Sequence, residues 1–335
     1  MNKKERVEFI YNIFLRNDIV KPWDIKKLLN EDRVTIYRDI QTLIKTWKVQ
    51  GIWKWKYTLK KDITSYFKTP FFERQKKQYN FDFLNSYIPN VSSFLNREQQ
   101  NMLNSILDKI DINTDYYKLN RRLLETTLID LSYASSYLEW NTYDYLDTEV
   151  LIKYNEIAKN KSLDDTQMIL NHKKAIEYLL YYKRDLGYTK NTFFEIHTLL
   201  WDKLLQKEDL WVIRDRLVEI WASSYKPLET RFQLNEQFEI FLNKLNEIVN
   251  PFEQSLFILV FIPYFQIFLD INKRVSRMIA ILPLIKNNLP IMSFLSTDKK
   301  LYITAILAIY ELNDTNMLAQ LYVDNYILNA NRYLW

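Results

Sequence analysis

The chain has 335 residues, of which 48% are hydrophobic and 26% charged, a balance typical of globular proteins. It contains no cysteine, which excludes disulfides, thiolate metal sites and a cysteine nucleophile. It also contains only two glycines, which leaves little material for the tight turns of β-hairpins. The composition therefore predicts a mainly helical protein.

The net charge of +5 is distributed unevenly. Residues 1–61 contain 11 lysines and 4 arginines against 7 acids, a net charge of +8, whereas the rest of the chain has a net charge of −3. This asymmetry predicts a polyanion partner for the first segment only. The N-terminal residues lack the pattern of a signal peptide, and the longest apolar run, 256–265, is far shorter than the roughly 20 residues of a membrane helix. We therefore expect a cytoplasmic protein.

Residues 1–61 show the pattern of three short helices followed by a hairpin. Apolar residues recur at helical spacing within 7–14, 23–29 and 36–44, and the segment WKVQGIWKWKYTLKK alternates aromatic and basic residues around Gly51. This order predicts a winged helix-turn-helix. The segment IKKLLNEDRVTIYRDIQTLIK resembles the helix-turn-helix of DeoR-type bacterial regulators.

The third of these helices is the expected DNA-recognition helix. Ile36, Ile40 and Leu43 are expected to form its buried stripe, which turns the polar residues outward. The residues expected to contact DNA are Arg33, Thr35, Arg38, Gln41, Thr42 and Lys45. The alternative is a charged face that docks a protein, but the concentrated positive charge favours DNA.

Residues 62–87 have no clear periodicity and contain Pro70, so we interpret them as a linker. Long helices with apolar periodicity follow over residues 88–335. They are interrupted at LVEIWASSYKP, where alternating residues and a proline predict a small β-hairpin. The chain is thus expected to contain a small basic domain and a larger helical one.

Three segments of the larger domain, in this order, resemble the Fic family. SSYLEWN (135–141) is similar to the autoinhibitory motif that precedes many Fic domains. RDRLVEIWASSYKP (214–227) resembles the hairpin flap that holds a target segment, and QIFLDINKRVSR (266–277) resembles the signature His-Pro-Phe-x-Asp-Gly-Asn-Gly-Arg-x-x-Arg. The resemblance covers most of residues 88–335, with a core at about 190–310, and implies an all-helical Fic-like (Fido) fold with a small β-hairpin flap.

The resemblance also implies roles for individual residues. Fic proteins transfer AMP from ATP to a hydroxyl of a target protein, and a divalent metal neutralises the phosphates. Carried onto this chain, Asp270 is the expected Mg²⁺ ligand. The expected nucleotide-binding residues are Asn272, Lys273, Arg274 and Arg277. Ser135 and Glu139 occupy the positions of the autoinhibitory pair, with Glu139 expected to reach Arg277.

The signature departs from the family pattern at several positions. Gln266 stands where the family has its catalytic histidine, and an amide has no useful proton affinity near neutral pH. Ile271 and Lys273 replace two glycines, and a β-branched residue adopts positive φ poorly. His197 is expected to be a packing residue, and His172 a surface or packing residue.

Three hypotheses for function follow. The first is a Fic-fold protein with impaired or absent AMP transfer, joined to a DNA-binding winged helix and acting as a regulator. The second is an active protein adenylyltransferase with a divergent motif, and the third is a protein-interaction scaffold. DNA is the expected partner of residues 1–61, and a protein target or partner is expected at the flap, residues 214–227. ATP with Mg²⁺ is the expected cofactor if the site still binds nucleotide. In the alternative, which the sequence supports equally, Asp270, Arg274 and Arg277 form an internally paired helix end that binds no nucleotide.

Overall fold

The computed structural model describes residues 2–16, 20–29, 31–45, 49–53, 56–59, 63–111, 113–204 and 210–333. Contacts within the chain divide it into two units, Met1–Glu73 and Arg74–Trp335. Each unit has its own hydrophobic core. Most of the described residues are helical, which confirms the predicted mainly helical class.

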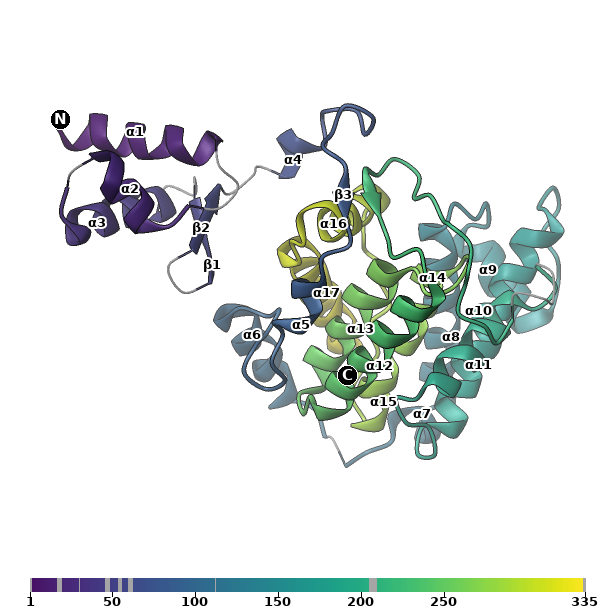
Figure 1. Cartoon of the computed structure of the whole chain (residues 1–335). Coiled ribbons are helices and arrows are strands. Elements are labelled where there is room, and N and C mark those ends of the chain that lie inside the picture. The colour runs from purple at the N-terminus through teal and green to yellow at the C-terminus, as the bar shows by residue number, and fades with distance from the viewer. Residues whose placement is uncertain are drawn as a thin grey trace. The chain divides into compact units, whose positions relative to one another are not determined.

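The first unit combines helices with one antiparallel pair of strands (Figure 1). Its elements are α1 (Lys3–Arg16), α2 (Pro22–Leu29), α3 (Arg33–Lys45), β1 (Val49–Trp53), β2 (Lys56–Leu59) and α4 (Ile63–Tyr66). Val20 adds a backbone bridge to this pair, with hydrogen bonds of 2.8 and 3.0 Å to Tyr57. The order of three helices and two paired strands is compatible with a winged helix.

The core of the first unit forms where the helical periodicity places it. Ile36, Ile40 and Leu43 are buried on α3, as expected. The helix begins after Asp32, whose Oδ1 accepts hydrogen bonds from the backbone N–H groups of Val34 and Thr35 at 2.8 and 2.9 Å. This N-cap fixes the start of the helix and therefore which residues face outward.

The second unit is a helical assembly with one short pair of strands (Figure 1). Its first half contains β3 (Lys77–Gln78), α5 (Phe81–Asn85), α6 (Arg97–Leu107), α7 (Tyr116–Leu119), α8 (Arg121–Leu138), α9 (Tyr145–Tyr154), α10 (Leu163–Tyr182) and α11 (Lys190–Trp201). Its second half contains β4 (Tyr225–Lys226), α12 (Arg231–Glu247), α13 (Pro251–Phe265), α14 (Asn272–Ile279), α15 (Leu282–Lys286), α16 (Lys299–Leu312), α17 (Asn316–Ala330) and a 3₁₀ turn (Asn331–Tyr333). None of the helices among the described residues combines the length and apolar content that a membrane span requires.

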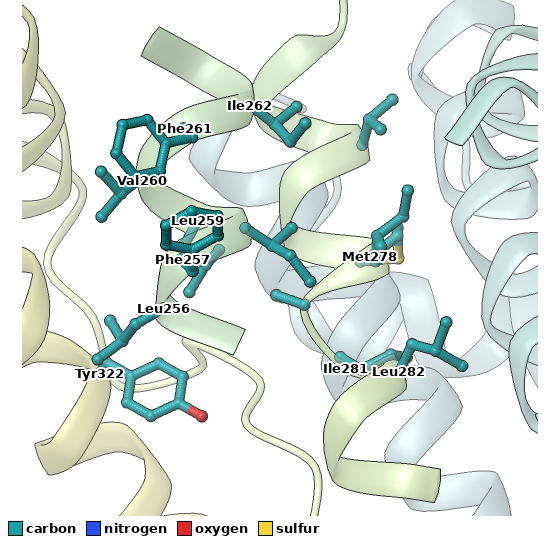
Figure 2. Packing of buried hydrophobic residues seen from close by; sticks show 14 of the residues in the cluster. Leu256, Phe257, Leu259, Val260, Phe261, Ile262, Met278, Ile281, Leu282 and Tyr322 are labelled. Carbon is teal, nitrogen blue, oxygen red and sulfur yellow. The ribbon is translucent and has the colours of Figure 1, made fainter. Parts of the chain in front are cut away.

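Helix α13 is the centre of this assembly and contacts α12, α14, α15 and α16. It is buried along almost its whole length and is mostly apolar around its circumference, so it is stable only when other helices surround it. Figure 2 shows Phe257 and Phe261 of α13 packed in the core, with Met278 of α14 and Tyr322 of α17 nearby. The buried helix ends at Phe265, and Gln266 is its C-cap and the first residue of the loop 266–271.

Part of the segment predicted as a linker packs into the second unit. Tyr79, Leu84 and Tyr87 are buried there, although residues 62–87 show no clear periodicity. A short strand and a single-turn helix are too brief to produce a periodic pattern, which explains why the sequence did not reveal them. The second unit therefore begins at Arg74 rather than at residue 88.

The predicted β-hairpin at the flap is wrong. Strand β4 pairs in parallel with β3, through Lys77–Tyr225 and Gln78–Lys226, instead of folding back on its own segment. A tight hairpin favours glycine or asparagine at its turn, and residues 214–227 contain neither. The alternating residues that suggested a hairpin belong instead to an extended loop, and its partner strand lies 148 residues earlier in the chain.

Candidate functional site

A cavity of about 250 Å³ lies where four separate segments of the second unit meet. These segments are the end of α8, the flap, the loop 266–271 with the start of α14, and α16. The residues that line it include Glu139, Trp140, Glu219, Trp221, Gln266, Asp270, Asn272, Lys273, Tyr302 and Tyr310. The three motifs recognised in the sequence therefore meet at one cavity.

Two residues with a left-handed backbone conformation and one asparagine side chain determine the shape of the loop 266–271. Gln266 has φ 52° and Ile271 has φ 58°. The Asn272 side chain closes the loop, because its Oδ1 accepts from the backbone N–H of Phe268 and its Nδ2 donates to the Phe268 carbonyl, both at 2.9 Å. Ile271 thus adopts a conformation that favours glycine, at a cost of about 1–2 kcal/mol. Burial of its side chain, which is 4% exposed, offsets that cost.

Gln266 is held firmly in the cavity wall. Its Nε2 donates to the Pro263 carbonyl at 2.8 Å and to the Tyr310 hydroxyl at 3.1 Å. Its Oε1 accepts from Asn272 Nδ2 at 3.2 Å. The amide is therefore fully engaged and presents no basic atom to the cavity.

Arg277 lies in the last turn of α14 and is buried. Every nitrogen of its guanidinium is hydrogen-bonded. Nε donates to Ser135 Oγ at 3.0 Å, Nη1 to the Tyr302 hydroxyl at 3.0 Å, and Nη2 to Glu139 Oε1 at 2.8 Å and to the Ser135 carbonyl at 3.1 Å. Lys273 Nζ lies 3.1 Å from the other carboxylate oxygen of Glu139. Glu139 thus pairs with two cations, Lys273 in the cavity wall and the buried Arg277.

This carboxylate is ionised at neutral pH. Burial alone would raise the pKa of Glu139, but Lys273 and Arg277 outweigh that effect and lower it to about 2. Burial likewise opposes the charge on Arg277, yet Tyr302 and Glu139 raise the pKa of this guanidinium above its usual value. The expected contact between Glu139 and Arg277 is present as a charged pair.

His172 lies behind Ser135. Its Nδ1 is 2.8 Å from the Met168 carbonyl, which places the proton on Nδ1, so that Nε2 accepts from the Ser135 hydroxyl at 2.9 Å. Burial, aided by Arg274, lowers the pKa of His172 to about 3. His172 is therefore a buried neutral base that orients Ser135 toward Arg277, a role that the sequence did not indicate.

His197 packs as expected. Its ring is buried and stacks on Phe268 with centroids 3.9 Å apart. Burial is the main reason that its pKa falls to about 3.

Arg274 differs from Arg277 in its contacts. It is buried, and within the described ranges its Nε and Nη1 have no hydrogen-bond partner. Its Nη2 lies 3.9 Å from Asp270 Oδ2, and burial lowers its pKa. The two donors Nε and Nη1 are buried inside the protein, and Arg274 is not among the residues that line the cavity.

Asp270 is a single exposed carboxylate, with 64% of its side chain accessible. No group of three or more potential His, Asp or Glu ligands occurs in the described part of the chain. One carboxylate fits Mg²⁺ only when phosphate oxygens and waters complete the shell. These residues therefore meet only part of what a metal-bound phosphate requires. Asp270 is accessible to a metal ion, whereas the cations Lys273 and Arg277 are already paired with Glu139.

The base of the flap is fixed by Arg214. Its Nε donates to the Gln266 carbonyl at 2.5 Å, Nη1 to the Arg216 carbonyl at 2.7 Å, and Nη2 to the Leu228 carbonyl at 2.5 Å. Farther along the flap, Leu217 and Trp221 are 69% and 82% exposed. The flap therefore presents large apolar side chains beside the cavity.

Several residues in the cavity wall or close to it have no signal in the sequence. Lys299 Nζ lies 4.1 Å from the ring centre of Tyr137 and 4.2 Å from that of Trp140, a cation–π contact that holds the end of α8 against α16. Tyr302 and Tyr310 are on the same helix, α16, far from all three motifs in sequence. Only the fold brings them to the cavity.

In the first unit, α3 carries the expected DNA-contacting residues. Arg33 and Arg38 are exposed, and Gln41 is half-buried. The Thr35 hydroxyl donates to Asp32 Oδ2 at 2.6 Å, and the Thr42 hydroxyl donates to the Arg38 carbonyl at 3.0 Å. Both threonine hydroxyls therefore already donate hydrogen bonds within the helix and its N-cap.

Two further side chains on α3 were not expected at this face. Val34 and Tyr37 are 57% and 40% exposed. Lys45 is the last residue of α3, and its side chain lies outside the described part of the structure. The exposed face of α3 thus combines arginines with two apolar groups.

Comparisons with known proteins identify the fold of the second unit. Residues 187–284 match the model of the Fic/DOC family. No curated protein sequence matches the chain.

Solved structures with this fold cover most of the second unit. A Fic domain containing signaling protein from Bacteroides thetaiotaomicron is 18% identical, with a TM-score of 0.57 over 70% of this chain and 96% of that one. Fic-1 from C. elegans is 17% identical, with a TM-score of 0.57 over 71% of each chain. A Fic family protein from Desulfovibrio desulfuricans G20 is 16% identical, with a TM-score of 0.59 over 73% of this chain and 76% of that one. The second unit therefore has a Fic fold.

Proposed function

We propose that this chain is a regulator in which a DNA-binding unit is joined to a Fic-fold unit that has lost AMP transfer. The observation that carries this proposal is the state of Gln266. Its amide stands where the resemblance requires a catalytic histidine, and hydrogen bonds to Pro263 and Tyr310 hold it in place. Without a general base, proton removal from a target hydroxyl loses a rate factor of roughly 10² to 10⁴.

The contacts of Glu139 support the same conclusion. A nucleotide phosphate in this cavity needs the cations that Glu139 holds, Lys273 at 3.1 Å and Arg277 at 2.8 Å. Release of Glu139 would have to precede binding of ATP and Mg²⁺, which the resemblance implies as cofactors. We propose that the resting protein keeps this site closed by charge pairing.

An active AMP transferase with a divergent motif is the second candidate, because one carboxylate supports it. Glu219 is on the flap and lines the same cavity as Gln266 and Asp270. A flap carboxylate could take the proton that Gln266 cannot. This candidate requires Glu219 for activity, which the first candidate does not.

Incubation with ATP and Mg²⁺ or Mn²⁺, followed by intact-mass measurement, tests the proposal. We expect the parent protein to gain no AMP group. A gain of AMP in the parent that disappears in Glu219→Gln would replace the first candidate with the second.

We propose that the flap, residues 214–227, docks a protein partner and that residues 1–61 bind duplex DNA. Support for the first comes from the exposed Leu217 and Trp221, and for the second from the net charge of +8 and the exposed Arg33 and Arg38. The combination describes a regulator that connects a DNA site to a protein partner.

A further inference from the structure

The flap is held by a buried ion pair that does not belong to any of the three motifs. Arg74 Nη1 lies 2.9 Å from Glu311 Oε1, and their side chains are 5% and 0% exposed. Arg74 Nη2 also donates to the carbonyl of Ala222, in the flap, at 2.6 Å. Arg74 therefore connects α16 to the flap through one guanidinium.

Glu311 connects to the flap from the other side. Its Oε1 accepts from Ser223 Oγ at 2.9 Å and from the Ser224 backbone N–H at 3.0 Å, and its Oε2 accepts from Ser224 Oγ at 2.8 Å. A buried carboxylate is stable only when its oxygens are paired in this way. Ala222, immediately before, has φ 58°, a strained conformation that these contacts fix.

The flap residues held by this pair adjoin those that form the cavity wall. Residues 219–221 line the cavity and are followed directly by the held residues 222–224. Tyr225 then stacks on Tyr310, with ring centres 5.5 Å apart, and Tyr310 accepts the hydrogen bond from Gln266. The ion pair and the cavity are thus adjacent along the flap and along α16.

Arg74 also has a special place in the chain. It is the first residue of the second unit and directly follows Glu73, the last residue of the first. Three residues later, β3 begins at Lys77, whose backbone N–H donates to the Ser224 carbonyl at 3.0 Å. The segment 74–78 is therefore bound to the flap by both side chain and backbone.

We infer that Arg74 and Glu311 are positioning residues for the flap, and that segment 74–78 supports the flap side of the cavity wall from behind. The position of residues 219–221 then depends on how firmly segment 74–78 is held. This inference concerns the resting protein and does not depend on whether the cavity binds nucleotide or transfers AMP.

Hydrogen exchange of the full chain, followed by mass spectrometry, tests this inference. In Arg74→Ala and in Glu311→Gln, we expect amides within 219–226 to exchange about tenfold faster or more, because local opening no longer breaks the ion pair. Amides of α13 should keep the parent rate. Lys76→Ala is the matched control, because Lys76 is an exposed cation of the same segment, and it should behave as the parent.

A second variant covers the case in which a single replacement unfolds the protein. Arg74→Met with Glu311→Met removes both charges and leaves neither buried without a partner. We expect the same acceleration within 219–226. Parent rates in the flap of the folded variants would overturn the inference, and so would equal acceleration in the flap and in α13, because that result assigns the pair to global stability alone.

Discussion

Glu139 and Arg277 form an ion pair of 2.8 Å between the end of α8 and the last turn of α14. The pair survives although the position of the catalytic histidine holds Gln266. Its retention is explained by structure, because Arg277 is 3% exposed and a buried guanidinium without a counter-charge is costly.

Replacement of Glu139 by alanine is expected to destabilise the second unit. Because Lys273 and Arg277 lower the pKa of Glu139 from 4.5 to about 2, the charged pair contributes about 3 kcal/mol near neutral pH. Thermal melting of the two proteins measures the loss. Glu149→Ala is the control, because Glu149 forms an exposed pair with Lys153 at 2.5 Å that contributes less than about 1 kcal/mol.

The same variant reports on phosphate binding. If Lys273 and Arg277 become available, ATP with Mg²⁺ should raise the melting temperature of Glu139→Ala more than that of the parent, by mass action. An equal melting temperature of the two proteins in buffer would contradict the pairing. Absence of any ATP response in both would contradict a surviving anion site.

The pH dependence of stability should carry the signature of the buried histidines. The pKa of His197 is lowered from 6.5 to about 3, so between these values the unfolded chain binds a proton that the folded chain does not. The stability contributed by the neutral ring is complete above pH 6.5 and is lost as the pH falls toward 3. Because of His197, the free energy of unfolding should be about 2 kcal/mol lower at pH 5 than at pH 7.

His197→Phe isolates this effect, because phenylalanine can keep the stack on Phe268 without titrating. Urea unfolding at pH 7 and pH 5 should show a smaller difference in the variant than in the parent, by about 2 kcal/mol. A difference as large as that of the parent would show that His197 does not titrate as described. Glu139 adds a separate loss at lower pH, from about 4.5 downward, since its folded pKa is also lowered.

The sequence predicted the elements that have strong periodicity or a recognisable motif. The buried stripe of Ile36, Ile40 and Leu43 and the pairing of Glu139 with Arg277 both followed from residue spacing or resemblance. These features depend on residues close together in sequence or on a pattern shared by many chains. The assignment of DNA contacts and of the nucleotide site stays a prediction.

The features that the sequence missed depend on contacts between distant segments. Strand β3 has two residues, and its partner β4 follows 148 residues later, so no local pattern indicates the pairing. His172 acquires its function only because Ser135 on α8 faces it. The αL conformation of Ile271 contradicts local preference and is imposed by the fold around it.

DNA binding by the first unit is expected to depend strongly on salt. Each phosphate contact contributes a slope of about −0.9 to the dependence of log K on log salt concentration. Arg38→Ala should therefore weaken binding to duplex DNA and reduce the slope by about 1. Lys4→Ala, an exposed cation on α1, is the control and should change the slope less. Binding that ignores salt, or an equal loss in both variants, would assign the charged face of α3 to another partner.

AMP transfer should return when the signature is rebuilt around a base. Gln266→His supplies the missing proton acceptor, Ile271→Gly removes the strain of φ 58°, and Lys273→Gly opens the first turn of α14 to a phosphate. Adding Glu139→Gly releases Arg277 from its ion pair at 2.8 Å, so the quadruple variant should self-modify more than the triple variant. The control keeps Gln266 and carries only the other three replacements, so a mass gain specific to the histidine variant measures the base alone. That gain should correspond to a rate factor of roughly 10² or more. If the folded quadruple variant gains no AMP in the presence of ATP and Mg²⁺, then positions of the cavity beyond these four also prevent transfer, and the missing base does not by itself account for the proposed lack of AMP transfer.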